Sequence, residues 1–126
     1  GQRVEKKREI FHYYEESFRG ISDISMMPIH GAYQECNCWL SSFIMSKTCL
    51  ITPLDIQLAL EDENIEARPI WKPMHMQPYF EKFDYVNNEA TAQSIFERGI
   101  CLPSDTKMTI DDLNKVCEIV KGCFGK

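Results

Sequence analysis

Four helical patterns alternate with three short apolar runs along this chain of 126 residues, and the alternation constrains its fold more than any other feature. In the first pattern, apolar side chains recur at helical spacing from Val4 through Phe11, Tyr14 and Phe18 to Ile21. Such spacing places them on one face of an amphipathic helix. Because the connections between the patterns are short, their order favours a small α/β (α+β) sandwich.

The other three helices are predicted from signals at their ends. Thr52 can cap a helix and Pro53 suits the first helical position, so we expect a helix that runs to about Glu63. A third helix ends at Gly99, because glycine is common just past a helix C-terminus. Thr109 caps the last helix, whose apolar residues again recur every three or four positions.

Three segments are expected to be strands: residues 36–45, 67–72 and 100–102. Their side chains are compatible with strands, and the prolines of the second confine it to a sheet edge or to the margin of a site. Residues 21–35 contain a proline and a glycine, and we expect an irregular stretch there. We therefore predict a single domain, residues 1–126, with a three-stranded antiparallel sheet that carries helices on one face.

Composition excludes several classes of protein. The chain has 14 basic and 19 acidic side chains and a net charge of −5, which gives no electrostatic support for nucleic-acid binding. No apolar run approaches the roughly 18 residues of a membrane span, and residues 1–10 lack the apolar core of a secretory signal. The six cysteines fit neither a disulfide framework nor a zinc knuckle. We expect a cytoplasmic protein in which the cysteines are small buried side chains and no metal is bound.

One segment stands apart in this acidic chain. Residues 67–80 contain arginine, lysine and histidine but no acid, and three of the six prolines of the chain. Each proline follows a polar side chain, namely Arg68, Lys72 or Gln77, and proline holds the residue before it extended. In an extended strand Arg68 and Lys72 would share a face about 13 Å apart, a span that suits a large anionic ligand. From the residues alone, an irregular solvated loop explains the segment equally well.

Resemblance to a known family favours the ligand site. The segment IEARPIWKPMHMQPYF (65–80) closely resembles a signature of the DegT/DnrJ/EryC1/StrS family of pyridoxal-phosphate-dependent sugar aminotransferases. The nearest branch acts on UDP-linked 4-keto-6-deoxy amino sugars for surface polysaccharides and glycoprotein glycans. KKREIFHYYEE (6–16) is similar to the helix that enters the small domain of this family, and NCWLSSFIM (37–45) to its first strand. Two longer segments, 52–69 and 95–116, resemble the rest of that domain.

The resemblance implies that this chain is the C-terminal small domain of a longer aminotransferase of fold type I. The large N-terminal domain of such enzymes carries the cofactor-binding loops and the Schiff-base lysine. We therefore expect pyridoxal phosphate in the full-length parent but not on this fragment, no catalytic residue within the chain, and no activity of the fragment alone. The parent is expected to be a homodimer that transfers an amino group to a keto nucleotide sugar.

The resemblance also assigns the substrate-binding residues. Arg68 and Lys72 would contact phosphate oxygens, and Arg68 could do so with two parallel hydrogen bonds. Trp71 would either stack on a ring of the ligand or pack under its strand. His75 would donate to a sugar or phosphate oxygen, and Gln77 would lie near the same ligand.

Other hypotheses about the function of the chain fit the same residues. Some members of the family lack the lysine and act as dehydratases, and others look regulatory. The chain could also be a stand-alone ligand-binding or interaction module with the same fold. If it is instead a detached domain, we expect an exposed apolar patch on the first helix around Phe11, Tyr14 and Phe18, with weak self-association.

Overall fold

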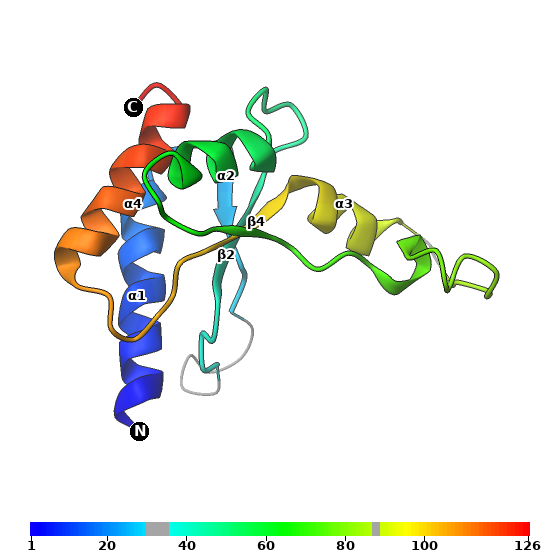
Figure 1. The fold of residues 1–126 in the computed structure, drawn as a ribbon, viewed down its shortest axis with the longest axis horizontal. Helices are drawn as coiled ribbons and strands as arrows, with labels where there is room; N and C mark the ends of the chain where they lie inside the picture. The colour runs from blue at the N-terminus through cyan, green and yellow to red at the C-terminus, as the bar shows by residue number, and fades with distance from the viewer. Residues whose placement is uncertain (30–35, 87–88) are drawn as a thin grey trace.

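The structure is a computed structural model that describes residues 1–29, 36–86 and 89–126 (Figure 1). Within these ranges the elements follow in the order α1 (Gln2–Phe18), β1 (Ile24–Met26), β2 (Ser41–Met45), α2 (Pro53–Glu61), β3 (Arg68–Pro69), the 3₁₀ helix η2 (Met74–Met76), α3 (Thr91–Arg98), β4 (Gly99–Leu102) and α4 (Ile110–Cys123). The predicted α+β class is confirmed. None of the described helices is both long enough and apolar enough for a membrane crossing.

The sheet contains four strands in the described residues, and the predicted count of three is therefore wrong. The strands are antiparallel neighbours in the order β1-β2-β4-β3. The additional strand β1 lies inside the stretch 21–35 that we expected to be irregular, and residues 30–35 of that stretch lie outside the described residues. A strand of three residues is too short to show an alternating pattern, so only its pairing with β2 reveals it.

Two of the predicted strands are shorter in the structure than in the prediction. We expected the first to begin at residue 36, but β2 begins at Ser41. Cys38 has a φ of 48°, in the left-handed region, which interrupts extended backbone before the strand. The second predicted strand, 67–72, is reduced to the two residues of β3 at the sheet edge.

Helices α1, α2 and α4 pack on one face of the sheet and close the core (Figure 1). The register pairs Phe43 of β2 with Ile100 of β4, and both side chains are buried beneath these helices. Tyr14 and Phe18 of α1 stack at 6.0 Å, and the ring of Phe18 meets that of Phe43 edge-on at 5.6 Å. The apolar face of α1 therefore lies inside the domain.

This burial contradicts the exposed patch that we expected on the first helix. Phe11, Tyr14 and Phe18 are 1%, 0% and 2% exposed. The helical periodicity was interpreted correctly, but the surface that covers it belongs to the same domain. The hydroxyl of Tyr14 donates to the carbonyl of Pro103 at 2.7 Å, so even its polar end is satisfied internally.

Helix α3 lies on the opposite face of the sheet, so three of the four helices occupy the predicted face. Its Ile95 lines an apolar hollow together with Ile44 and Ile70. Ile44 alternates along β2 with the buried Phe43 and Met45, which places it on the face away from the core. Helix α3 and residues 70–86 extend away from the three-helix body (Figure 1).

Candidate functional site

A groove of about 660 Å³ lies on the face of the sheet that α1, α2 and α4 leave open. It is bounded by the residues before β2, by β3 and the chain that follows it, by α3, and by β4 with the chain after it. Three of the five residues predicted to bind substrate line this groove: Arg68, Trp71 and Lys72. Segments far apart in the sequence thus meet where the resemblance placed the ligand.

Arg68 faces the open side because β3 pairs antiparallel with β4. The register sets it opposite Cys101, whose side chain also lines the groove. The Nε and Nη2 atoms of Arg68 each lie 2.8 Å from Oε1 of Glu66, and both side chains are mostly exposed. An exposed ion pair contributes little stability. The contact with Glu66 positions the guanidinium, and the exposure of the Arg68 side chain leaves it open to an incoming anion.

Trp71 and Trp39 form the aromatic wall of the groove. Their ring centroids are 6.0 Å apart with a tilt of 34°, and the two residues are 65% and 62% exposed. Of the two alternatives for Trp71, packing under its strand does not fit this exposure. Trp39 was not predicted as a residue of the site, because the segment 36–45 that contains it was assigned to a regular strand. The left-handed Cys38 just before it turns the chain so that this indole projects into the groove.

The remaining two predicted residues, His75 and Gln77, lie beyond the groove in the chain at and after η2. Gln77 donates from Nε2 to the carbonyl of Lys72 at 3.1 Å, so it stabilises the turn that follows the groove wall. The ring of His75 stacks on Tyr85 at 3.8 Å with a tilt of 10°. The Nε2 atom of His75 is buried without a hydrogen-bond partner among the described residues.

Cys101 is the one thiol that lines the groove within the described part of the chain. Burial raises the pKa of its thiol, which keeps it protonated near neutral pH. A protonated thiol is a poor nucleophile. The thiol of Cys101 is therefore not expected to act as a nucleophile in this groove.

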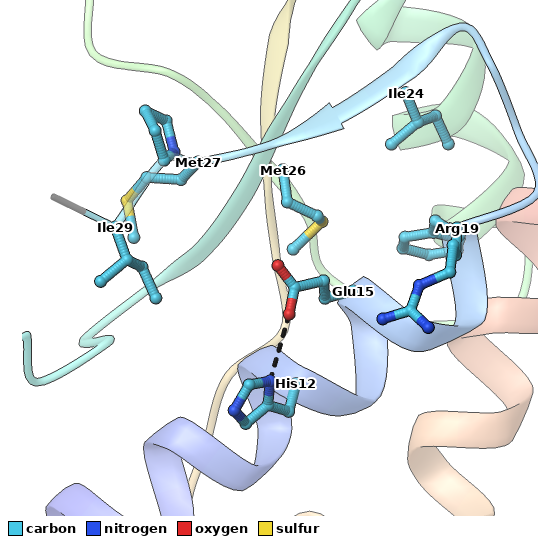
Figure 2. A pocket seen from close by; sticks show the side chains of 9 residues that line it. His12, Glu15, Arg19, Ile24, Met26, Met27 and Ile29 are labelled. Atoms are coloured by element: carbon cyan, nitrogen blue, oxygen red, sulfur yellow. Dashed lines mark hydrogen bonds and ion pairs between the residues drawn. The ribbon is translucent and has the colours of Figure 1, made fainter. Parts of the chain in front are cut away.

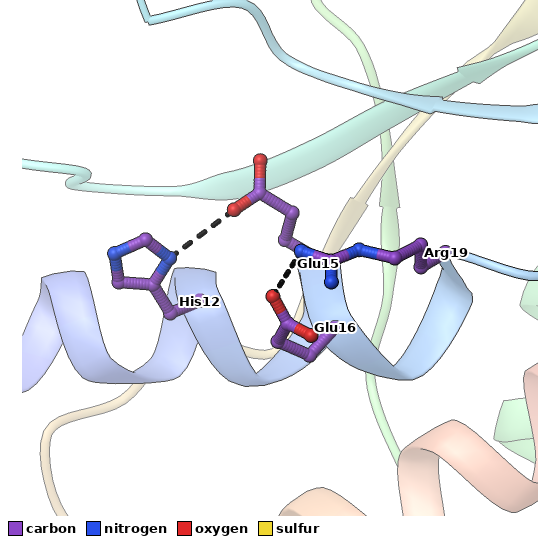
Figure 3. A network of polar contacts seen from close by, with 4 residues as sticks. All are labelled: His12, Glu15, Glu16 and Arg19. Carbon is purple, nitrogen blue, oxygen red and sulfur yellow. Dashed lines mark hydrogen bonds and ion pairs between the residues drawn. The ribbon is translucent and has the colours of Figure 1, made fainter.

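A second hollow, of about 460 Å³, lies between α1 and β1 (Figure 2). His12 and Glu15 point into it from the helix, with Nδ1 and Oε2 3.1 Å apart. Arg19 pairs with Glu16 one turn along the same helix (Figure 3). These are a hydrogen bond and an ion pair, each between residues three positions apart on a solvated helix face, and such contacts are explained by helix stability alone.

Comparison with known proteins identifies the domain. Residues 1–121 match the profile of the DegT/DnrJ/EryC1/StrS aminotransferase family. The chain belongs to this family. It is 38% identical over 126 residues to EpsN of Bacillus subtilis, which is named as a pyridoxal phosphate-dependent aminotransferase. It is 27% identical over 121 residues to the GDP-perosamine synthase of Vibrio cholerae.

The chain spans about a third of the length of these relatives. The alignments cover 98% and 96% of this chain but 32% of each relative. Among solved structures, the aminotransferase TlmJ from Streptoalloteichus hindustanus superimposes with a TM-score of 0.80 at 16% identity, over 97% of this chain and 32% of that chain. At this identity the match shows a shared fold.

The described residues do not build a pyridoxal phosphate site by themselves. Such a site needs a lysine amine for the aldehyde and a cradle of backbone N–H groups for the phosphate. The capped N-termini of α2 and α4 already hold a carboxylate, that of Asp55 and that of Asp112. Lys72 lines the groove on exposed chain, with no such cradle around it. No group of three or more potential metal ligands occurs in the described residues.

Proposed function

We propose that this chain is the small domain, residues 1–126, of a pyridoxal-phosphate-dependent aminotransferase that transfers an amino group to a keto nucleotide sugar. The observation that carries the proposal is the groove, where two cationic side chains and two exposed indoles line one hollow in a chain of this family. A nucleotide sugar offers a diphosphate for cations and flat rings for aromatic side chains. The names of EpsN and of the GDP-perosamine synthase agree with that substrate class.

In this proposal the chain orients substrate and performs no bond chemistry. Arg68 binds a phosphate oxygen and Lys72 adds a second positive charge, which fixes one end of the substrate so that the keto carbon is presented to the reaction centre. Bound pyridoxal phosphate supplies the electron sink for the transfer. His75 and Gln77 shape the margin of the same site. The substrate we favour is a UDP-linked 4-keto-6-deoxy amino sugar of surface polysaccharide synthesis, handled by a cytoplasmic homodimer.

The experiment replaces Arg68 with alanine in the full-length parent. A charge-assisted hydrogen bond is worth about 1.5–3 kcal/mol, so KM for the nucleotide sugar should rise roughly 10- to 150-fold. The turnover number should change little, because a phosphate remote from the reacting carbon is bound equally in the ground and transition states. Arg68→Lys should restore part of the affinity, since the planar fork is lost but the charge remains.

Glu66 provides the matched control. Glu66→Gln breaks the same ion pair but leaves the guanidinium in place. If Arg68 binds phosphate, this variant keeps a normal or lower KM. If the pair is instead structural, both variants lower the melting temperature and neither changes KM. An unchanged KM in Arg68→Ala would reject the phosphate role.

The groove would also suit a dehydratase of the same family. The residue at the Schiff-base position distinguishes the two enzymes, and we expect it to lie outside this chain. Analysis of the product decides: an amino sugar supports the transferase, and a deoxy keto sugar without nitrogen gain supports the dehydratase. A stand-alone binding module would bind nucleotide sugar and give neither product.

A further inference from the structure

The chain contains two tryptophans, and both lie at this groove. We infer that Trp39 and Trp71 form an aromatic platform that stacks the base of a nucleoside diphosphate, while Arg68 and Lys72 hold its phosphates. This inference rests on the proposed function and adds to it a residue, Trp39, that neither the sequence pattern nor the family resemblance singled out. Large aromatic side chains that remain exposed side by side are typical of ligand-binding or partner-binding surfaces.

Trp39 is exposed, yet its backbone is fixed by several hydrogen bonds. Nζ of Lys7 in α1 donates to the carbonyl of Trp39 at 3.0 Å and also to that of Ser104, which lines the groove as well. The N–H of Trp39 donates to Oδ1 of Asn37 at 3.0 Å, and Nε of Arg8 donates to the carbonyl of Cys36 at 2.8 Å. Helix α1 therefore holds the side of the groove that carries Trp39. Because this wall is ordered before a ligand binds, less conformational entropy is lost on binding.

The geometry of the two indoles indicates how a base would bind. A base inserted between them would need ring centroids about 7 Å apart, twice the contact distance of aromatic carbons. The rings are 6.0 Å apart and tilted by 34°, so they already contact each other. A base therefore lies against the outer, solvent-facing surface of the pair. This platform accepts any base because every base has a flat face.

The phosphates of the same ligand fall beside the cations. Arg68 and Lys72 precede and follow Trp71 along one short stretch of chain, and all three line the same groove. The contact with Glu66 engages two of the five N–H donors of the guanidinium, which leaves donors for a phosphate oxygen. A groove of about 660 Å³ lies in the size range of small-ligand sites. The aromatic platform, the adjacent cations and the size of the groove together fit a nucleoside diphosphate.

A docking protein is the competing occupant, and the composition of the groove disfavours it. The more apolar exposed surface of the chain lies farther along, where Tyr79 and Phe83 are 70% and 56% exposed. The groove in contrast combines its aromatic wall with two cations and is hollow. We therefore assign the small ligand to the groove and leave the apolar segment for contacts with protein.

The test uses the 126-residue chain, whose buried core is formed by its own elements. Because its two tryptophans are the proposed platform, tryptophan fluorescence reports directly on the site. UDP should quench the emission and bind in calorimetry. Pyrophosphate should bind without quenching, and N-acetylglucosamine alone should do neither. Trp39→Ala should weaken UDP binding roughly 5- to 150-fold, the loss expected for one base–aromatic stack. Trp39→Phe should retain most of the affinity.

Phe83→Ala is the matched control, since it removes an exposed aromatic ring outside the groove and should leave UDP binding unchanged. Equal UDP affinity in Trp39→Ala and the wild type would overturn the inference. So would quenching by N-acetylglucosamine alone, which would assign the platform to the sugar. Loss of assembly in the full-length parent with unchanged affinity would assign it to a protein partner. If UDP fails to bind while Arg68→Ala still raises KM in the parent, the platform is rejected and the proposed function stands.

Discussion

The two faces of the sheet differ in how completely the chain covers them. On the inner face, α1 and α4 each bury four side chains. On the outer face, η2 and α3 bury none. Residues 70–86 and α3 extend from the body there (Figure 1). The inner face is thus covered by the chain and forms the core, whereas the outer face leaves a groove and aromatic side chains exposed to solvent. The core that stabilises the domain lies on one side of the sheet, and the binding groove that we propose lies on the other.

The exposed apolar side chains are not confined to the outer face, because Leu50, Leu54, Leu58 and Ile110 are exposed in and beside α2 and α4. Beyond the groove they concentrate in the segment that leads to α3, where large hydrophobic residues are 46–89% exposed: Met74, Tyr79, Phe83, Tyr85 and Val86. A contiguous exposed apolar surface is typical of a binding face. Because the chain spans about a third of its relatives, we expect that segment to contact protein in the parent. The prediction of an exposed patch on α1 is wrong, because Phe11, Tyr14 and Phe18 are buried.

The largest effect is expected from a core ring. Phe43 is 1% exposed and contacts Phe18 edge-on. Phe43→Ala removes that contact and leaves a cavity, so the free energy of unfolding should fall by about 3–5 kcal/mol. Urea unfolding followed by far-UV circular dichroism measures the loss, with Phe43→Leu as a milder control. A loss below about 1 kcal/mol would mean that the inner face is not the stabilising core.

The next effect lies at the junction between the two regions. A Cβ atom on Gly99 would lie 2.5 Å from Cγ1 of Ile70 and 2.7 Å from the backbone oxygen of Ile95. The oxygen cannot yield unless α3 moves, so Gly99→Ala should cost about 1–3 kcal/mol. Hydrogen exchange of the α3 amides should accelerate more than that of the α4 amides. Equal acceleration in both helices would show that α3 unfolds together with the core.

A smaller effect is expected from the cap of α4. Oγ1 of Thr109 accepts from the N–H of Asp112 at 3.2 Å, and the Thr109 N–H donates to the Asp112 carboxylate at 2.8 Å. Thr109→Ala should cost about 1 kcal/mol at neutral pH. Hydrogen bonds from the Thr109 N–H, and then from its hydroxyl, hold the pKa of Asp112 below its ordinary value of 3.8.

The pH dependence of this cap follows from the lowered pKa. The carboxylate contributes its stabilisation above pH 3.8, and this is lost as the pH falls further, through the folded-state pKa. The difference in melting temperature between wild type and Thr109→Ala should therefore narrow in acid. A difference that stays constant from pH 7 to pH 2.5 would contradict the role of the carboxylate.

How far the sequence could predict this molecule depended on whether the determining contacts were local. The caps at Thr52 and Thr109 were predicted correctly because each involves a residue three positions away. Strand β1 was missed because pairing with β2 defines it. The apolar face of α1 was identified, but periodicity does not tell which surface will cover it. Trp39 was missed because its position depends on the left-handed backbone of Cys38 and on Lys7.

The smallest effect on the isolated chain should come from the outer segment. Phe83 is 56% exposed, and its nearest contacts are the ring of Phe80 at 6.1 Å and Nζ of Lys82 at 5.4 Å. An exposed cation–π contact is worth about 0.5–1 kcal/mol, so Phe83→Ala should cost at most about that amount in the 126-residue chain. In the full-length parent the same substitution should cost more, because there we expect protein to cover the ring. Melting temperatures of both forms, measured side by side, test the contrast between the two faces. Equal and small losses of stability in both forms would show that the segment remains uncovered in the full-length parent. A loss in the 126-residue chain near that of Phe43→Ala would remove the distinction between core and outer face.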